Sequence, residues 1–190
     1  MDSKELELVD RARNGDIEAF TGLVERCWMR LVGFARTVVG DSDAEDCVQE
    51  SLVAVWEKLA TLRDCAAFQS WALRIVARRC VRRARRQARF VPLTFAVEGA
   101  DPRRTSDTEA IQVESVLALL PPRQRAVMHL TVIEGMTDSE IGAALAISPA
   151  SVRSHRRRAR ETLSPKLRQC RFPEDEENET ARGREPGRPV

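Results

Sequence analysis

Apolar residues return at alternating steps of three and four along most of the first ninety positions. In the first such stretch they share one helical face: Ile17, Phe20, Val24, Cys27, Leu31, Phe34 and Val38. This period predicts an amphipathic helix of about six turns. Gly40, Asp41 and Ser42 interrupt the pattern, and a shorter helix is expected near residues 4–13.

Two further apolar stripes follow along the chain. The second lies on one face of residues 44–62: Ala44, Val48, Ser51, Leu52, Val55, Trp56, Leu59 and Leu62. The third begins after Arg63-Asp64-Cys65: Phe68, Trp71, Ala72, Ile75, Val76 and Cys80. Helices joined by such short connections pack as antiparallel neighbours, which predicts a small helical bundle.

The helical period stops after this bundle and then returns. Pro92, Gly99 and Pro102 punctuate residues 90–109, which are predicted to be a flexible linker. The period resumes over residues 113–120, and Pro121-Pro122 ends that helix and begins another, which Val127, Leu130 and Ile133 carry to Gly135. We therefore expect an all-α chain of two small helical domains, residues 1–89 and 110–170, joined by the linker 90–109 and followed by a disordered tail, 171–190.

Residues 135–163 carry the pattern of a helix-turn-helix. Thr137 and Glu140 fit a capping box at the start of a short helix over residues 138–145. Ser148 is a good N-cap and Pro149 a good first residue for a second helix that follows a tight turn and runs to about Leu163. Two short helices across a tight turn form a helix-turn-helix.

The second of these helices has the chemistry of a DNA-reading helix. Its buried face is expected to hold Val152, His155, Ala159 and Leu163, with another set pointing away to enter a major groove: Ser151, Arg153, Ser154 and Arg157. Three more arginines are expected to contact phosphates: Arg156, Arg158 and Arg160. The alternative is a solvated basic helix, but five arginines in residues 153–160 without an acid favour DNA binding.

Two other charged segments stand out. Residues 74–89 hold eight arginines and no acid, as expected for a helix that lies along a phosphate backbone. Within one decade, an acidic segment contains Asp41, Asp43, Glu45, Asp46 and Glu50. The helix dipole accounts for the acids nearest the helix start but not for Glu50. Local physics therefore leaves two readings open for this segment, ordinary dipole pairing or a basic protein partner.

Composition sets limits on the class of protein. With 43% hydrophobic and 32% charged residues and a net charge of +2, the chain is neither disordered nor membrane-spanning. It has no expected signal peptide, which makes the cytoplasm the default location. The five cysteines form no C-x-x-C pair. Cys27 and Cys47 lie on apolar helical stripes, where a reduced cysteine acts as a small hydrophobic residue, and a thiol redox switch is the alternative. No catalytic grouping, cofactor motif or metal-ligand cluster is visible, so the chain is predicted not to be an enzyme and to need no cofactor or metal.

The chain resembles bacterial sigma factors of the extracytoplasmic-function (ECF) group of the sigma-70 family. Residues 43–50 (DAEDCVQE), 55–59 (VWEKL) and 68–78 (FQSWALRIVAR) are similar to that family's region two. Residues 120–125 (LPPRQR), 134–141 (EGMTDSEI), 148–154 (SPASVRS) and 159–160 (AR) are similar to its region four. The likeness covers roughly residues 5–170, in order.

The resemblance implies a specificity subunit that binds core RNA polymerase and directs it to promoters. It places the clamp of the largest polymerase subunit against Asp43, Glu45, Asp46, Gln49 and Glu50. It places the melted minus-ten strand near Arg63, Asp64, Gln69, Ser70, Arg74 and Arg78. It assigns the minus-35 duplex to Ser151, Arg153, Ser154, Arg156, Arg157 and Arg158. It also implies an anti-sigma factor as a partner.

The sequence departs from the family pattern at several positions. Arg79 and Arg83 stand where relatives often carry Asn and an acid, Ala146 stands where Gly is common, and His155 replaces an apolar residue and is expected to be packed. Ala146 suggests a slightly different turn. The acidic tail around residues 174–179 is expected to be inert, or else to compete with DNA for the arginine helices. A stand-alone helix-turn-helix regulator is the main alternative function, and an adaptor with a solvated basic surface is a third; the acidic segment argues against the stand-alone regulator.

Overall fold

The computed structural model describes residues 3–90, 117 and 119–167. Within those ranges every regular element is helical, so the expected all-α class is confirmed. The predicted linker, most of the helix expected over residues 113–120, and the tail lie outside the described residues.

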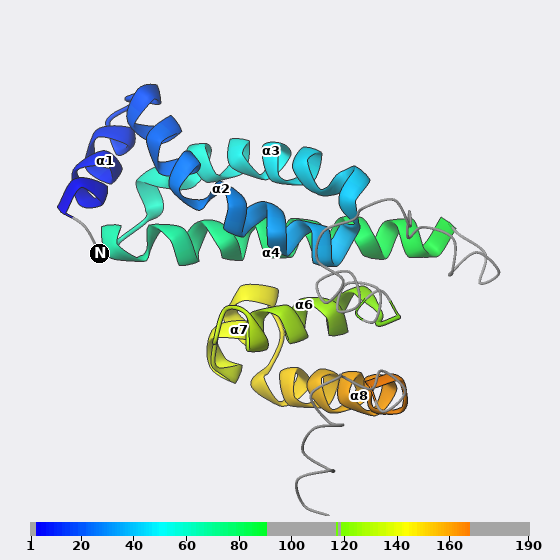
Figure 1. The fold of residues 1–190 in the computed structure, drawn as a ribbon. Coiled ribbons are helices and arrows are strands. Elements are labelled where there is room, and N and C mark those ends of the chain that lie inside the picture. Colours follow the sequence, from blue (N-terminus) through cyan, green and yellow to red (C-terminus); the bar gives the residue numbers. More distant parts are fainter. Residues whose placement is uncertain (1–2, 91–116, 118, 168–190) are drawn as a thin grey trace, which may run out of the picture.

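Four helices form the N-terminal part of the chain (Figure 1). They are α1 (Ser3–Arg13), α2 (Ile17–Val39), α3 (Asp41–Lys58) and α4 (Phe68–Phe90). Asp16 caps α2 by accepting hydrogen bonds from the backbone of Glu18 and Ala19. Gly40 has a φ of 88°, a conformation that favours glycine, and joins α2 to α3 within a single residue. As a result α3 begins at Asp41, earlier than the apolar pattern predicted.

Two short 3-10 turns, Leu59–Thr61 and Cys65–Ala67, connect α3 to α4. Most residues of the predicted apolar stripes are buried or partly buried in this part, and Phe34 and Phe68 are among the largest fully buried side chains. The prediction was wrong for Ile17, which is 60% exposed because it is the first residue of α2. The stripes therefore form one bundle core. It holds α3 and α4 side by side, which brings the acidic and the basic segments together.

Three helices form the C-terminal part: α6 (Pro122–Val132), α7 (Asp138–Leu145) and α8 (Pro149–Leu167). The predicted capping box is present, with the Thr137 hydroxyl accepting from the Glu140 amide and the Glu140 carboxylate accepting from the Thr137 backbone N–H. The Ser148 hydroxyl accepts from the Ser151 amide, so it caps α8 as predicted. The helix-turn-helix prediction is confirmed, although α8 runs four residues past Leu163.

The turn between α7 and α8 is set by two small residues. Ala146 adopts a left-handed conformation with φ 53° and ψ 52°, which is the conformation that glycine takes at the end of a helix. The expectation of a different turn at this position was therefore wrong. At Gly142 an added Cβ would lie 2.8 Å from the carbonyl oxygen of Ile147. Glycine is required there because the turn passes too close for a side chain.

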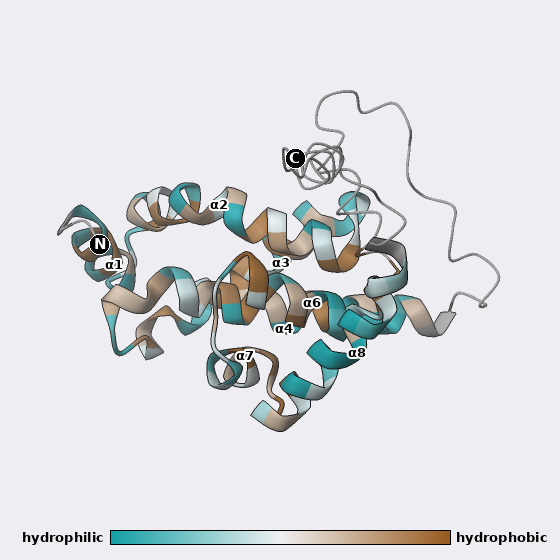
Figure 2. Ribbon diagram, turned by 60° about the horizontal axis from the view of Figure 1, so that its bottom comes forward, coloured by the Kyte–Doolittle hydropathy of each residue, from teal (hydrophilic) through white to brown (hydrophobic). Residues whose placement is uncertain are grey.

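The two parts pack against each other. In Figure 1 α6 and α7 lie directly beside α4, and α6 also contacts α2. One continuous core runs through both parts and includes Val127, Leu130 and Ile141 together with the buried residues of α1–α4. Figure 2 shows the hydrophobic positions gathered between the helices and a mostly hydrophilic α8.

Two details of the C-terminal part differ from the sequence analysis: the end of α6, which was expected near Gly135, and the burial of His155. Ile133 is 69% exposed because α6 ends at Val132 and the chain turns away from the core. His155 is only partly buried, since it lies at the edge of the α8 face rather than at its centre. The other three residues of that face, Val152, Ala159 and Leu163, are buried as predicted.

None of the helices in the described ranges has the length and apolar character needed to cross a membrane.

Candidate polymerase and nucleic-acid surfaces

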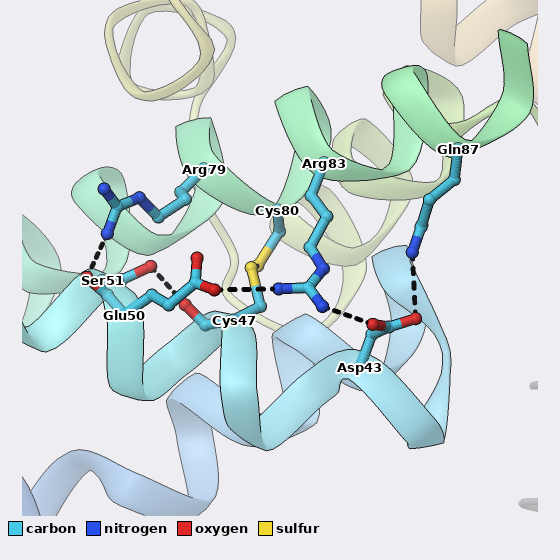
Figure 3. Close-up of polar contacts among 8 residues, drawn as sticks. All are labelled: Asp43, Cys47, Glu50, Ser51, Arg79, Cys80, Arg83 and Gln87. Atoms are coloured by element: carbon cyan, nitrogen blue, oxygen red, sulfur yellow. Dashed lines mark hydrogen bonds and ion pairs between the residues drawn. The ribbon is translucent and has the colours of Figure 1, made fainter. Parts of the chain in front are cut away.

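The acidic face of α3 is partly neutralised by α4 (Figure 3). Arg83 donates to Asp43 at 2.5 Å and to Glu50 at 3.3 Å, and Gln87 donates to the other Asp43 oxygen at 2.9 Å. The hydrogen bond with Asp43 raises the pKa of the Arg83 guanidinium. Asp43 and Arg83 are each about 27–29% exposed, so their ion pair lies at the edge of the bundle rather than in open solvent. Arg83 therefore anchors the acidic segment to the basic helix.

Beside that ion pair, a buried cysteine of α3 contacts a buried cysteine of α4. The sulfurs of Cys47 and Cys80 are 3.2 Å apart, and Ser51 donates to the Cys47 carbonyl (Figure 3). The hydrogen bond between the two thiols lowers the pKa of Cys47 and raises that of Cys80. Arg79 of α4 also reaches α3, where it donates to the backbone carbonyl of Glu50. The two arginines that depart from the family pattern, Arg79 and Arg83, are thus the ones that join α4 to α3.

The remaining expected polymerase contacts face outward. Asp46 and Gln49 are exposed and take part in no ion pair among the described residues, and Glu45 is exposed with Arg36 at 3.7 Å. The structure therefore divides the five expected residues into two groups. Asp43 and part of Glu50 are tied to α4, while Glu45, Asp46 and Gln49 are available to a partner.

The residues expected at the minus-ten strand fall into two groups along α4. Arg63 and Asp64 are exposed in the connection before the helix, where Asp64 caps the 3-10 turn by accepting from the Ala66 amide. Gln69 donates to Glu5 of α1 at 2.9 Å, and Ser70 donates to the Ala67 carbonyl. These contacts fix the start of α4 against the connection and leave Arg63 free to meet a nucleic acid.

Arg74 and Arg78, further along α4, lie against the C-terminal part of the chain. Arg78 donates to the backbone carbonyls of Ala144 at 2.9 Å and Ala143 at 2.5 Å, near the end of α7. Helix ends leave carbonyls without intrahelical partners, so a guanidinium there satisfies them and meets the negative end of the helix dipole. At the other end of α7, the pKa of Glu140 is lowered mainly by its hydrogen bonds with Thr137, and the charge of Arg74 lowers it slightly further.

The residues of α8 that are expected to contact DNA differ in their exposure and in their partners within the chain. Arg153 and Arg157 are about 60% and 68% exposed, and Arg158 is also exposed. Arg156 is only 22% exposed and pairs with Asp138 of α7 at 2.7 Å. Ser151 shares a hydrogen bond with Ser148, and Ser154 is partly buried. Arg160, which was expected to contact a phosphate, is exposed as well. The exposed arginines of α8 are therefore the residues best placed to meet a duplex, while Arg156 supports the helix-turn-helix.

Several partners of these residues were missed by the sequence reasoning. Asp138 was read only as part of the capping segment, yet it faces Arg156 and lies 3.6 Å from Arg153. Arg83 was read as part of a DNA-facing helix and as a departure from the family pattern, and Gln87 was not singled out. No sequence signal links residues so far apart, whereas the pair Arg157–Glu161 has the i,i+4 spacing of a helical ion pair and could have been predicted.

The chain is similar to known sigma factors in both sequence and structure. The family model of sigma-70 region 2 matches residues 23–90, and that of sigma-70 region 4 matches residues 110–163. It is 32% identical over 154 residues to the ECF RNA polymerase sigma factor SigM of Mycobacterium tuberculosis, covering 79% of this chain and 78% of that protein. It is 31% identical over 189 residues to the probable RNA polymerase sigma factor RfaY of Xanthomonas campestris. That match covers 93% of this chain but only 46% of the relative's length.

Among solved structures, the chain is similar to that of CnrH in complex with the cytosolic domain of CnrY. The two share 28% sequence identity with a TM-score of 0.61, and the match covers 88% of this chain and 99% of that one.

Proposed function

We infer that this chain, which belongs to the ECF group of sigma-70 family RNA polymerase sigma factors, binds core RNA polymerase and directs it to promoters. The observation that carries this function is the order of the two family regions on helices that present one acidic and two basic surfaces. A stand-alone helix-turn-helix regulator is not favoured, because it would have no use for region 2. As a specificity subunit the chain would act in the cytoplasm, beside polymerase and promoter DNA, and would not itself catalyse a reaction.

The proposed polymerase contact is the outer face of α3, composed of Glu45, Asp46, Gln49 and the exposed side of Glu50. Asp46 has no ion pair among the described residues. Glu45 and Glu50 remain exposed although Arg36 lies 3.7 Å from Glu45 and Arg83 lies 3.3 Å from Glu50, so all three carboxylates are accessible to a basic surface on the polymerase clamp. Asp43, by contrast, is proposed to hold α3 in place through Arg83. Of the five residues expected to contact the polymerase clamp, we therefore propose four as direct contacts and leave out Asp43.

The proposed minus-ten surface is the start of α4 and the connection before it. Arg63 and Asp64 are exposed there, while Gln69 and Ser70 hold the helix start in position through Glu5 and the Ala67 carbonyl. A single strand is held by pockets, stacking and backbone charge rather than by groove readout. Arg74 and Arg78 extend this positive surface along α4.

The proposed minus-35 surface is the exposed side of α8. Arg153 lies near its N-terminus, where a recognition helix contacts base edges, and Arg157 and Arg158 are exposed one turn further. Arginine pairs with guanine through two hydrogen bonds, so Arg153 is proposed to read a base, while Arg157 and Arg158 are proposed to contact the duplex beside it. Ser151 and Ser154 would add short polar contacts.

An inhibitory protein partner is also proposed. The similar structure of CnrH contains the cytosolic domain of CnrY, and by that likeness this chain would be held by an anti-sigma factor when it is not in use.

The test of this function is run-off transcription with purified core polymerase on a library of promoter fragments, with and without the chain. The chain is expected to make initiation depend on two promoter elements. Reversing Asp46 to Lys should weaken core binding and initiation together. The matched control, Glu25→Lys, changes an exposed acid of α2 that has no described ion pair and should leave both unchanged. Sequence-specific duplex binding without any initiation would instead support a stand-alone regulator.

A further inference from the structure

Two cysteines from different helices meet inside region 2. The Sγ atoms of Cys47 on α3 and Cys80 on α4 lie 3.2 Å apart, and both side chains are fully buried (Figure 3). A disulfide bond holds its sulfurs about 2 Å apart, so these two atoms need to approach by only about 1 Å to form one. Among the four described cysteines, this is the pair whose sulfurs are in contact.

The other two described cysteines have different surroundings. The Cys27 thiol is turned toward carbonyls one turn earlier in its own helix, and burial raises its pKa to about 11. Cys65 lies in the connection before α4, where it is partly exposed and contacts Arg13 and Asp10 of α1. Neither set of contacts includes a sulfur atom, so neither thiol is placed to form a disulfide within the described part of the chain.

The groups around the buried pair favour a thiolate at Cys47. The hydrogen bond between the two thiols lowers the pKa of Cys47 and raises that of Cys80, which corresponds to Cys80 keeping its proton. Burial and the charge of Glu50 oppose the lowering at Cys47, while the charges of Arg83 and Arg79 strengthen it. The thiolate is the form of cysteine that attacks an oxidant. The pair therefore consists of one nucleophilic sulfur with a protonated sulfur beside it.

The pair lies close to the edge of the bundle. In Figure 3 the Arg83 guanidinium and the Glu50 carboxylate lie beside the two sulfurs. The Glu50 side chain is 60% exposed and that of Arg83 is 29% exposed. An ion pair with one partner so exposed costs little to open. Hydrogen peroxide is barely larger than water, so a brief opening of this ion pair is wide enough to admit it.

We propose that Cys47 and Cys80 form a peroxide-sensitive dithiol, whose oxidation to a disulfide fixes α3 to α4. The Cys47 thiolate attacks hydrogen peroxide and becomes a sulfenic acid, and the hydroxide that leaves takes up the proton that Cys47 had released. The Cys80 thiol then attacks the oxidised sulfur, the S–S bond forms, and its proton leaves with the sulfenic hydroxyl as water. The two thiols together lose two electrons and two protons, and one peroxide is reduced to two waters. A dithiol reductant reverses the step by thiol–disulfide exchange.

The disulfide would join the two helices that carry the proposed surfaces of region 2. The cysteines are 33 positions apart in the sequence, and a disulfide that closes such a loop restricts the unfolded chain. Because Cys47 is buried whereas Asp46 and Gln49 are exposed, the disulfide leaves the proposed polymerase contact uncovered. Oxidation therefore stabilises region 2 in the form that binds polymerase. This consequence rests on the proposed function, but the disulfide itself is measurable on the free chain.

The test exposes the free full-length chain to hydrogen peroxide, blocks the remaining thiols with an alkylating agent and maps disulfides by peptide mass spectrometry. We expect a peptide pair joined through Cys47 and Cys80, and two fewer free thiols than in the reduced chain. Dithiothreitol should restore both thiols. The Tm of the oxidised chain should exceed that of the reduced chain by at least about 4 °C, as for a disulfide in a chain of this size.

Variants separate the roles of the two sulfurs. Cys80→Ser should stop the reaction at the sulfenic acid of Cys47, which dimedone traps as a covalent adduct. Cys47→Ser should leave Cys80 as a thiol under the same treatment, because no lowered pKa then provides a thiolate. The matched control is Cys65→Ser, which replaces a partly exposed cysteine and should still form the disulfide. Circular dichroism checks that each variant keeps its helical content.

The wild-type chain alone can overturn the proposal, so the test does not depend on the folding of any variant. If peroxide left both thiols free, or joined either of them to a different cysteine, the two residues would be no more than small apolar side chains of the core. If the disulfide formed without raising the Tm, its stabilising effect would be refuted. Neither measurement needs polymerase, so a failure of the proposed function remains distinguishable.

Discussion

At the scale of single residues, Asp43 and Asp46 of the same acidic segment are expected to do different work. Asp43 accepts two hydrogen bonds from α4, whereas Asp46 faces solvent. Asp43→Ala should lower the free energy of unfolding by about 1 kcal/mol, the upper range for a partly exposed ion pair. Asp46→Ala should leave it within about 0.5 kcal/mol, as for an ordinary surface position.

Urea denaturation and binding to core polymerase together separate these roles. Asp46→Ala should weaken core binding at normal stability. Arg83→Ala should reproduce the stability loss of Asp43→Ala, and Arg86→Ala, an exposed arginine of the same helix, serves as its control. Equal stability of Asp43→Ala and wild type would show that the Arg83 ion pair contributes nothing.

The turn of the helix-turn-helix offers opposite predictions at two neighbouring positions. Ala146→Gly should stabilise the chain by roughly 1 kcal/mol, because the left-handed conformation costs about that much for a residue with a Cβ. Gly142→Ala should destabilise it by more than about 1 kcal/mol, because the new Cβ would lie 2.8 Å from the Ile147 carbonyl oxygen. Thermal unfolding of both variants checks the pair. A loss of stability in Ala146→Gly would mean that the left-handed turn is not adopted in solution.

At the scale of helices, α8 carries exposed arginines and one arginine held by α7. Arg153→Ala should cost about 1–3 kcal/mol of minus-35 binding and relax the sequence preference at one position, as for a side chain that pairs with a base edge. Arg156→Ala should instead lower the stability of region 4, because it leaves the Asp138 carboxylate without its nearest partner. Binding titrations on a duplex with single base changes measure the first effect. An unchanged base preference in Arg153→Ala would contradict its reading role.

The helices themselves could be predicted from the sequence, and most of their ends could too. Apolar period located α2, α3 and α4, and capping residues located the start of α7 and α8. The start of α3 was missed because Gly40 turns the chain within one residue, which a broader Gly-Asp-Ser break does not reveal. Periodicity shows which face of a helix is buried, but it does not show which helix covers it. For that reason the pairing of Arg83 with Asp43 was not predictable.

At the scale of the whole molecule, the contact between the two regions was also beyond the sequence. The predicted linker separates the two domains along the chain, but it does not indicate whether they touch or which residues make the contact. Arg30 and Glu134, which pair across that contact, are 104 positions apart, and each reads as an ordinary surface charge in its own helix. The resemblance to the family therefore identified the candidate DNA-contacting residues. Only the folded structure shows that one of them, Arg78, donates hydrogen bonds to α7 of region 4.

The contact between the two parts of the chain depends on pH in a definite direction, because His129 of α6 packs against Phe34 and Thr37 of α2. Burial of His129 at the interface lowers its pKa from the ordinary 6.5, with Arg30 of α2 lowering it further and Glu134 opposing that shift. Because its pKa is lowered in the contact, His129 takes up a proton more readily when the two parts are apart. Its contribution to the stability of the contact is therefore fully present above the ordinary pKa of histidine. That stabilisation is lost as the pH falls through the ordinary value toward the lowered one. The contact between the two regions should therefore weaken as the pH falls below about 6.5, the ordinary pKa of histidine.

Small-angle scattering over a pH window that spans this ordinary pKa measures the opening of the contact, and two variants identify its source. His129→Gln removes the titrating ring and should make the radius of gyration independent of pH across the window. His155 also has a pKa lowered, first by burial and then by Arg123 and Arg158, but these groups lie within region 4, so His155→Gln should keep the pH-dependent expansion. If His129→Gln expanded with acid as wild type does, the opening would have to arise from another group.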